Sequence, residues 1–298
     1  YRAAAVYADP GIQRQTMGYK IPARAASWGV WGVASLLLLA IAWPTADSLV
    51  DDAFISARYA DHFAAGHGLV YNAGEPPIEG YTNLLWTLLV GAALALGGDA
   101  HMVMVWLGMG FGVCTVGAAM LATRALVGRH VFPASWGAGL LEESEHARMV
   151  GVQDAWPASW GAGLLVATSP HLAVVMSNGL ETSMYTAAVL FSVWAVFSAE
   201  GRWRLAAGVL LGLCGWIRPE GAVVAAALCL YDLFRHRRAW RQPSTWLIVG
   251  ASSITEVILF VWRRWTYGVW LPNTFSAKEP GIALHWTWNF KRIIGPDA

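Results

Sequence analysis

Residues 102–123 read MVMVWLGMGFGVCTVGAAMLAT and contain no charged side chain. A helix needs about 20 predominantly apolar residues to cross a bilayer, so this stretch predicts a transmembrane helix. Similar apolar runs occur elsewhere in the chain, at 27–43, 157–177, 182–198 and 245–262, with shorter ones at 205–217 and 221–234. The sequence therefore predicts an all-α, polytopic integral membrane protein.

The composition agrees with a membrane protein. Hydrophobic residues make up 56% of the 298 residues and charged residues 13%, against about 25% charged in soluble domains. Tryptophan, which favours the bilayer interface, lies near the ends of several apolar runs, at Trp43, Trp203, Trp216, Trp240 and Trp270. A net charge of +1 without a basic stripe excludes a nucleic-acid partner. The three cysteines lie inside apolar runs and are predicted to be small core residues, Cys114, Cys214 and Cys229.

We expect one membrane domain over 1–298. Residues 1–26 form its cytoplasmic N-terminal segment, 27–266 its transmembrane core and 267–298 an exoplasmic loop. Because no helix follows that loop, the domain is expected to be incomplete at its C-terminus.

Residues 83–97 decide the sidedness of the chain. They form a helix of only about 22 Å, short for a hydrocarbon core about 30 Å thick. If they do not cross, the inner side carries 13 of the 20 basic residues, namely Arg2, Arg14, Lys20, Arg24, Arg124, Arg129, Arg148, Arg202, Arg204, Arg235, Arg237, Arg238 and Arg241. If they cross, the split is even. Cytoplasmic loops are enriched in Lys and Arg, so we predict a re-entrant or interfacial segment.

With that topology, four polar clusters share the exoplasmic side. They are Asp51-Asp52 in the long loop 44–82, the segment 178–181, the turn 218–220 and the segment 273–278. Polar groups that converge on one side of a membrane are what an active site needs. The alternative topology scatters them.

Asp51 and Asp52 follow the first apolar run directly. Paired carboxylates at a membrane surface can act as a general base or bind a divalent cation, and they can equally stabilise the start of a helix. A third metal ligand is not evident from the spacing.

Arg218-Pro219-Glu220 separates two apolar runs that are too short to cross the hydrocarbon core, so the turn should line a wet cavity below the surface. The planar guanidinium of Arg218 suits a phosphate, although an internal Arg218 to Glu220 ion pair would explain the motif equally. Glu181 should begin a helix with Asn178 as its cap.

Two further features are expected in loops. Asn273 and Lys278 lie in a turn-forming segment, where a lysine is commonly just solvated. The string PASWGAGLL occurs at 133–141 and again at 157–165. We interpret it as a local tandem duplication or an irregularity of the sequence itself, and nothing catalytic should depend on 142–156.

Six short strings occur in one order over residues 51–278: DDAFISARYA, GHGLVYNAGE, EGYTNLLWT, SNGLETSMY, IRPEG and YGVWLPNTFSAK. Together they resemble the GT-C superfamily of polytopic membrane glycosyltransferases, in particular the branch of terminal arabinofuranosyltransferases of cell-wall arabinan. In such enzymes the first exoplasmic loop carries the acidic motif, and the donor is a polyprenyl-phosphate sugar. The resemblance implies a multi-pass cell-envelope (inner-membrane) protein with an exoplasmic active site.

The implied reaction moves a sugar from the polyprenyl-phosphate donor to an acceptor hydroxyl of a glycan, lipid or protein, with inversion. Asp51 or Asp52 would be the catalytic base, and a divalent metal, if present, would bind there. Arg218 and Lys278 would neutralise the departing phosphate, while Glu181, Glu220 and Asn273 complete the substrate-binding set.

Two other classes stay open. A transporter with a broken-helix site would be expected to show paired repeats in its two halves, and the sequence contains none beyond the nine-residue duplication. A degenerate relative that serves as a structural subunit of a membrane complex would be expected to lose acidic residues first, yet Asp51, Asp52, Glu181 and Glu220 are all present.

Overall fold

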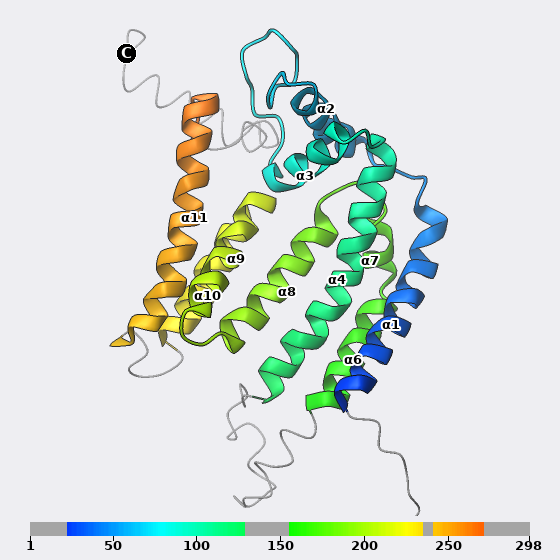
Figure 1. Ribbon diagram of the computed structural model, residues 1–298, viewed down its shortest axis with the longest axis vertical. Helices are drawn as coiled ribbons and strands as arrows, with labels where there is room; N and C mark the ends of the chain where they lie inside the picture. Colours follow the sequence, from blue (N-terminus) through cyan, green and yellow to red (C-terminus); the bar gives the residue numbers. More distant parts are fainter. Residues whose placement is uncertain (1–22, 129–154, 235–240, 271–298) are drawn as a thin grey trace, which may run out of the picture.

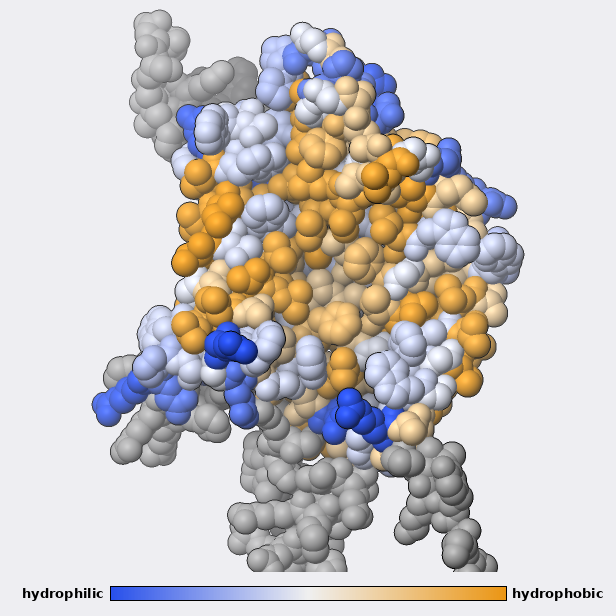
Figure 2. Space-filling model, in the orientation of Figure 1, coloured by the Kyte–Doolittle hydropathy of each residue, from blue (hydrophilic) through white to orange (hydrophobic). Residues whose placement is uncertain are grey.

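The computed structural model describes residues 23–128, 155–234 and 241–270, and within these ranges it contains helices and no strands. Three helical segments there are long and apolar enough to cross a membrane, over Ala23–Thr45, Ala100–Val127 and Pro243–Tyr267. Figure 2 shows the hydrophilic colours gathered toward the two ends of the molecule and hydrophobic surface between them. The protein is therefore a helical membrane protein.

The helices form a bundle whose long members run between its two ends (Figure 1). In chain order the elements are α1 (Ala23–Ala42), η1 (Trp43–Thr45), α2 (Asp51–Ala64), α3 (Leu84–Ala95), α4 (Ala100–Gly128), α6 (Ala155–Ala167), α7 (Pro170–Val175), α8 (Thr182–Ser198), α9 (Trp203–Ile217), α10 (Gly221–Phe234) and α11 (Pro243–Tyr267). We call the end that carries α2 and α3 the upper end, as in Figure 1.

The segment predicted to be re-entrant lies at this upper end. Helix α3 spans 12 residues, and Figure 1 shows it lying across the bundle beside α2. Helix α4 then starts at the same end at which α1 finished. Residues 84–95 thus do not pass from one end of the bundle to the other.

The loop 44–82 differs from the sequence prediction because it contains a helix of 14 residues, α2. Its two N-terminal residues are Asp51 and Asp52, where negative charge is favoured by the helix dipole. Gly91 of α3 lets the two helices approach closely, since a Cβ there would lie 3.1 Å from the carbonyl oxygen of Ala60.

The run 157–177 was predicted as one apolar segment, and the structure divides it into α6 and α7. The division falls at Thr168 and Ser169. Ser169 caps α7 by accepting a hydrogen bond from the backbone nitrogen of Leu172, and Pro170 follows in the first turn. A proline at this position starts a new helix, since it has no N–H to continue the old one. The first copy of the nine-residue repeat lies outside the described residues, and the second lies within α6.

Close packing between α9 and α11 depends on glycines. A Cβ on Gly212 would lie 2.6 Å from Cβ of Thr255, and one on Gly208 would lie 2.6 Å from the carbonyl oxygen of Ile248. Small residues of this kind allow membrane helices to pack backbone to backbone. Of the three cysteines predicted to be core residues, Cys214 and Cys229 are buried, whereas Cys114 is exposed, which corrects the prediction for that residue.

Candidate functional site

The upper end of the bundle holds a cluster of buried polar side chains. Glu79, Asn83, Glu181 and Arg263 are each at most 5% exposed. Buried polar groups are costly unless they are paired. Their partners therefore define the geometry of this end.

Glu181 is held between two donors from different helices. Nδ2 of Asn83 donates to its Oε2 at 2.7 Å, and Nε of Arg218 lies 3.0 Å from its Oε1. Each carboxylate oxygen thus has one partner. Because the Glu181 side chain is only 6% exposed, it acts as an anchor for Arg218 rather than as a surface group.

Asn83 is itself fixed in orientation. Its Oδ1 accepts hydrogen bonds from Ser56 of α2 at 3.2 Å and from Thr87 of α3 at 3.0 Å. Its amide nitrogen therefore points at Glu181. The chain of contacts runs from α2 through the start of α3 to the start of α8, so it joins three segments that are distant in sequence.

Arg218 ends α9 in an extended conformation, with φ of −150° and ψ of 141°. The backbone nitrogen of Gly221 donates to its carbonyl oxygen at 2.8 Å, which closes a tight turn into α10. The Arg218 side chain is 35% exposed. One edge of the guanidinium is thus bound to Glu181, and donors remain for a ligand.

Glu220 is exposed and does not pair with Arg218 in the described structure, so the alternative of an internal Arg218 to Glu220 ion pair is wrong. Its place is taken by Glu181, which packs from another helix. The prediction for Asn178 also needs correction, because Oδ1 of Asn178 accepts from the backbone nitrogen of Leu180 rather than capping α8. Glu181 occupies the N-cap position without a side-chain capping bond.

Asp51 and Asp52 are exposed in the first turn of α2. The residue before them, Val50, donates its backbone N–H to the carbonyl oxygen of Asn178 at 3.1 Å. This bond ties the acidic pair to the segment that carries Glu181. In addition, Ala53 and Ile217, the chain neighbours of Asp52 and Arg218, belong to one packed hydrophobic cluster.

Two further predictions concern the loop residues Asn273 and Lys278 and a metal site at the acidic pair. Asn273 and Lys278 lie outside the described residues. Within the described ranges, Asp51 and Asp52 do not form part of any group of three or more His, Cys, Asp or Glu side chains that could hold a metal ion.

A second buried ion pair was not predicted from the sequence. Nε of Arg263 lies 2.9 Å and 2.8 Å from the two carboxylate oxygens of Glu79. It fastens the loop before α3 to the upper end of α11. Burial raises the pKa of Glu79, and the hydrogen bond and charge of Arg263 oppose that rise. The spacing of α11 could have revealed it, because Arg263 continues the buried stripe Ile248, Thr255 and Leu259, while Arg264 falls off it.

A tyrosine network supports the same loop. Oη of Tyr267 donates to the carbonyl oxygen of Leu69 at 2.9 Å and lies 2.9 Å from Oη of Tyr81, so Tyr81 is the donor in that second bond. Tyr59 of α2 accepts from the backbone nitrogen of Gly80 at 2.9 Å. Burial raises the pKa of Tyr81, so its hydroxyl stays a donor at neutral pH.

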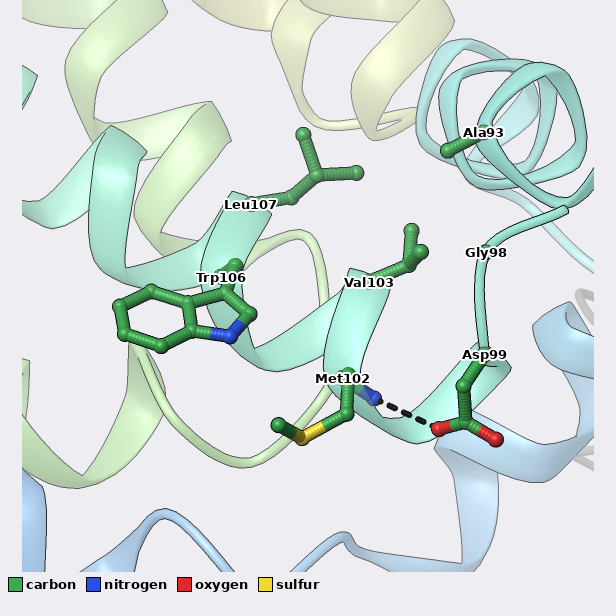
Figure 3. A pocket seen from close by; sticks show the side chains of 7 residues that line it. All are labelled: Ala93, Gly98, Asp99, Met102, Val103, Trp106 and Leu107. Carbon is green, nitrogen blue, oxygen red and sulfur yellow. Dashed lines mark hydrogen bonds between the residues drawn. The ribbon is translucent and has the colours of Figure 1, made fainter. Parts of the chain in front are cut away.

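An apolar pocket of about 390 Å³ lies where α3 meets α4. Figure 3 shows Val103 and Leu107 facing it from α4, with Ala93 opposite. Its carboxylate, Asp99, accepts a hydrogen bond from the backbone nitrogen of Met102 at 3.0 Å. The pocket has apolar walls, while the polar groups described above lie elsewhere at this end.

The fold and this end of the bundle define a helical membrane protein with buried carboxylates paired to arginines and an exposed acidic pair at the start of α2. Comparison with curated proteins finds a relative, the terminal beta-(1->2)-arabinofuranosyltransferase of Mycobacterium tuberculosis (strain ATCC 25618 / H37Rv), which is 28% identical over 240 residues. The alignment covers 78% of this chain and 35% of the relative. The chain thus spans about a third of that protein. This weak similarity suggests a glycosyltransferase, and hence an enzyme.

No family model matches the sequence, and no solved structure matches it.

Proposed function

We propose that the chain forms the catalytic membrane part of a GT-C glycosyltransferase. It moves a sugar from a polyprenyl-phosphate donor to an acceptor hydroxyl on the exoplasmic face, with inversion at the anomeric carbon. The upper end of the bundle is then the exoplasmic end. The observation that carries this proposal is Arg218, which a buried carboxylate holds in place at 3.0 Å while 35% of its side chain stays exposed.

The donor phosphate binds at the free edge of Arg218. A guanidinium can give two parallel hydrogen bonds to phosphate oxygens, and hydrogen bonds between charged groups are the stronger kind. Glu181 serves as a positioning residue, since both of its oxygens are occupied by Arg218 and Asn83. Lys278 supplies a second cation to the phosphate, while Asn273 and Glu220 contact the sugar.

In the transfer step, Asp51 or Asp52 removes the proton of the acceptor hydroxyl. The acceptor oxygen forms a bond to the anomeric carbon as the bond from that carbon to the phosphate oxygen breaks. The electron pair of the broken bond stays on the polyprenyl phosphate, where Arg218 stabilises the developing charge. The exposure of both aspartates leaves them open to an acceptor.

Measuring donor binding tests this assignment. The dissociation constant of a polyprenyl-phosphate sugar would be measured for the intact protein in proteoliposomes, for wild type, Arg218→Ala and Arg218→Lys. One or two lost charge-assisted bonds correspond to roughly a 10- to 100-fold weaker affinity for Arg218→Ala. Lysine keeps the charge without the planar fork, so Arg218→Lys should fall between the two.

Arg202→Ala is the matched control, because Arg202 is exposed and precedes α9 at its opposite end. It should bind the donor as wild type does. An Arg218→Ala protein whose affinity equals that of Arg202→Ala would rule out Arg218 as the phosphate ligand.

A further inference from the structure

A cavity of about 510 Å³ lies at the lower end of the bundle, away from the site described above. Its walls come from the first turns of α1, the C-terminal half of α4, the start of α6 and the middle of α8. Arginines and aromatic rings line it, among them Arg24, Arg124, Trp28, Trp31, Trp156 and Phe191. The volume falls within the range of roughly 300–1,000 Å³ that is typical of ligand sites.

The two arginines give the cavity a positive charge that no carboxylate among the described residues compensates. Within the described residues, neither Arg24 nor Arg124 forms an ion pair with a carboxylate. The Arg124 guanidinium lies over the Trp156 ring at 3.8 Å from the centroid. This contact holds the charge at the wall of the cavity without using the hydrogen-bond donors of the guanidinium.

Hydrogen bonds also fix the cavity wall. Nε1 of Trp31 donates to the carbonyl oxygen of Val113 at 3.3 Å. Ser27, another lining residue, accepts a hydrogen bond at 2.8 Å from Nε1 of Trp160, which lies outside the lining. A Cβ on Gly117 would lie 3.1 Å from Nε1 of Trp31, so that glycine keeps the space beside the ring open. The cavity is therefore shaped by fixed groups of α1, α4 and α6.

The position of the cavity suggests that it lies near one bilayer interface. Helices α1 and α4 are both long and apolar enough to cross a membrane, and Arg24 and Arg124 lie at their lower ends. Trp28, on the rim, is 65% exposed. Arginine and tryptophan at such ends are common interface anchors. Simple anchoring would not require four helices to enclose a space between the two charges.

We propose that this cavity binds an anionic phospholipid of the leaflet at the lower end. The phosphate lies between Arg24 and Arg124, and one acyl chain lies against Trp28, Trp31 and Leu121. A zwitterionic headgroup fits less well, because its own cation would approach two guanidinium groups that pair with no carboxylate in the described part of the chain. A soluble phosphate would leave the apolar walls uncovered. The proposal does not rest on the glycosyltransferase assignment.

Native mass spectrometry of the intact protein, released from detergent with added lipid, tests the proposal. Wild type should retain phosphatidylglycerol at least about tenfold more tightly than phosphatidylcholine, since two charge-assisted contacts are at stake. Arg24→Gln/Arg124→Gln should lose this preference. Arg202→Gln removes an exposed arginine near the start of α9, outside the cavity, and should keep it.

Two further measurements keep the proposal open to refutation. Arg24→Lys/Arg124→Lys keeps both charges and should retain part of the preference, which separates loss of binding from misfolding. Glycerol 3-phosphate, which offers the headgroup phosphate without a chain, should not displace the lipid. The proposal is overturned if the double glutamine variant keeps the preference, if phosphatidylcholine binds equally to wild type, or if glycerol 3-phosphate displaces phosphatidylglycerol at comparable concentration.

Discussion

Arg263→Met removes one partner of the buried ion pair that fastens the first loop to α11. Arg263 Nε contacts both carboxylate oxygens of Glu79, at 2.9 Å and 2.8 Å, and neither side chain is more than 5% exposed. Methionine retains an apolar stem but leaves the carboxylate buried without a cation. Breaking a buried pair in this way costs about 3–5 kcal/mol of unfolding free energy. For a chain of this size, that lowers the thermal midpoint by on the order of 10 °C.

The deficit should shrink at lower pH. Burial raises the pKa of Glu79 above its ordinary value of 4.5, and Arg263 opposes the rise, so removing Arg263 raises it further. A carboxyl with a higher pKa in the folded state takes up a proton on folding. Its contribution to stability is present below the ordinary pKa and is lost as the pH rises through the folded pKa. We therefore expect the midpoint of Arg263→Met to approach that of wild type as the pH falls from neutral toward about 5.

Thermal unfolding in detergent, followed by tryptophan fluorescence, measures both effects. Arg264→Met is the matched control, because Arg264 is the next residue on α11 and is exposed. It should change the unfolding free energy by less than about 0.5 kcal/mol. Glu79→Gln/Arg263→Met removes both charges and should recover much of the loss. Equal midpoints for the two arginine variants, or a double variant no more stable than Arg263→Met, would refute the reasoning.

Two glycine substitutions test close packing, each against a matched control and each by the same thermal assay. Gly212→Ala should destabilise the α9–α11 contact by about 1–3 kcal/mol, because its Cβ would lie 2.8 Å from the carbonyl oxygen of Ser252. Gly110→Ala is the control and should not destabilise, since the space around Gly110 is open; similar losses in both variants would contradict the packing account. Gly179→Ala should lower the unfolding free energy by about 1–3 kcal/mol more than Gly66→Ala does. Both glycines have a positive φ, of +84° and +81°, but of the two only Gly179 packs against Leu49 and Ala53; equal losses would mean that backbone strain alone acts.

Helix positions followed well from the sequence because apolar runs are a strong local signal. The run 182–198 became α8 with the same bounds, and 221–234 became α10. The break between α6 and α7 was missed, although Ser169 and Pro170 are a recognisable helix start. The interpretation of Asp51 and Asp52 as a helix start is confirmed, because they are the first two residues of α2, but the sequence analysis treated 44–82 as a loop and gave this helix no bounds.

The pairing of charges could not be foreseen. Glu220 lies two positions from Arg218, yet Arg218 pairs with Glu181, which is distant in sequence. The spacing of α11 could have indicated that Arg263 is the buried arginine, but its pairing with Glu79, a loop residue 184 positions away, follows only from tertiary packing. The sequence did predict that Asp51, Glu181 and Arg218 share one side. In the structure Glu181 and Arg218 contact each other, and the start of α2 is tied to the segment before Glu181 by the hydrogen bond from Val50 to Asn178.

Sugar transfer by the aspartate variants tests the central proposal most directly. Transfer from a polyprenyl-phosphate sugar to an acceptor glycan would be measured in proteoliposomes of the intact protein for Asp51→Asn, Asp52→Asn and the control Asp61→Asn, an exposed aspartate of the same helix. The account predicts that one of the first two variants loses roughly two to four orders of magnitude in turnover while donor affinity is retained, and that Asp61→Asn transfers normally. Transfer at the wild-type rate by both Asp51→Asn and Asp52→Asn would contradict it and leave the acidic pair as a helix-start feature alone.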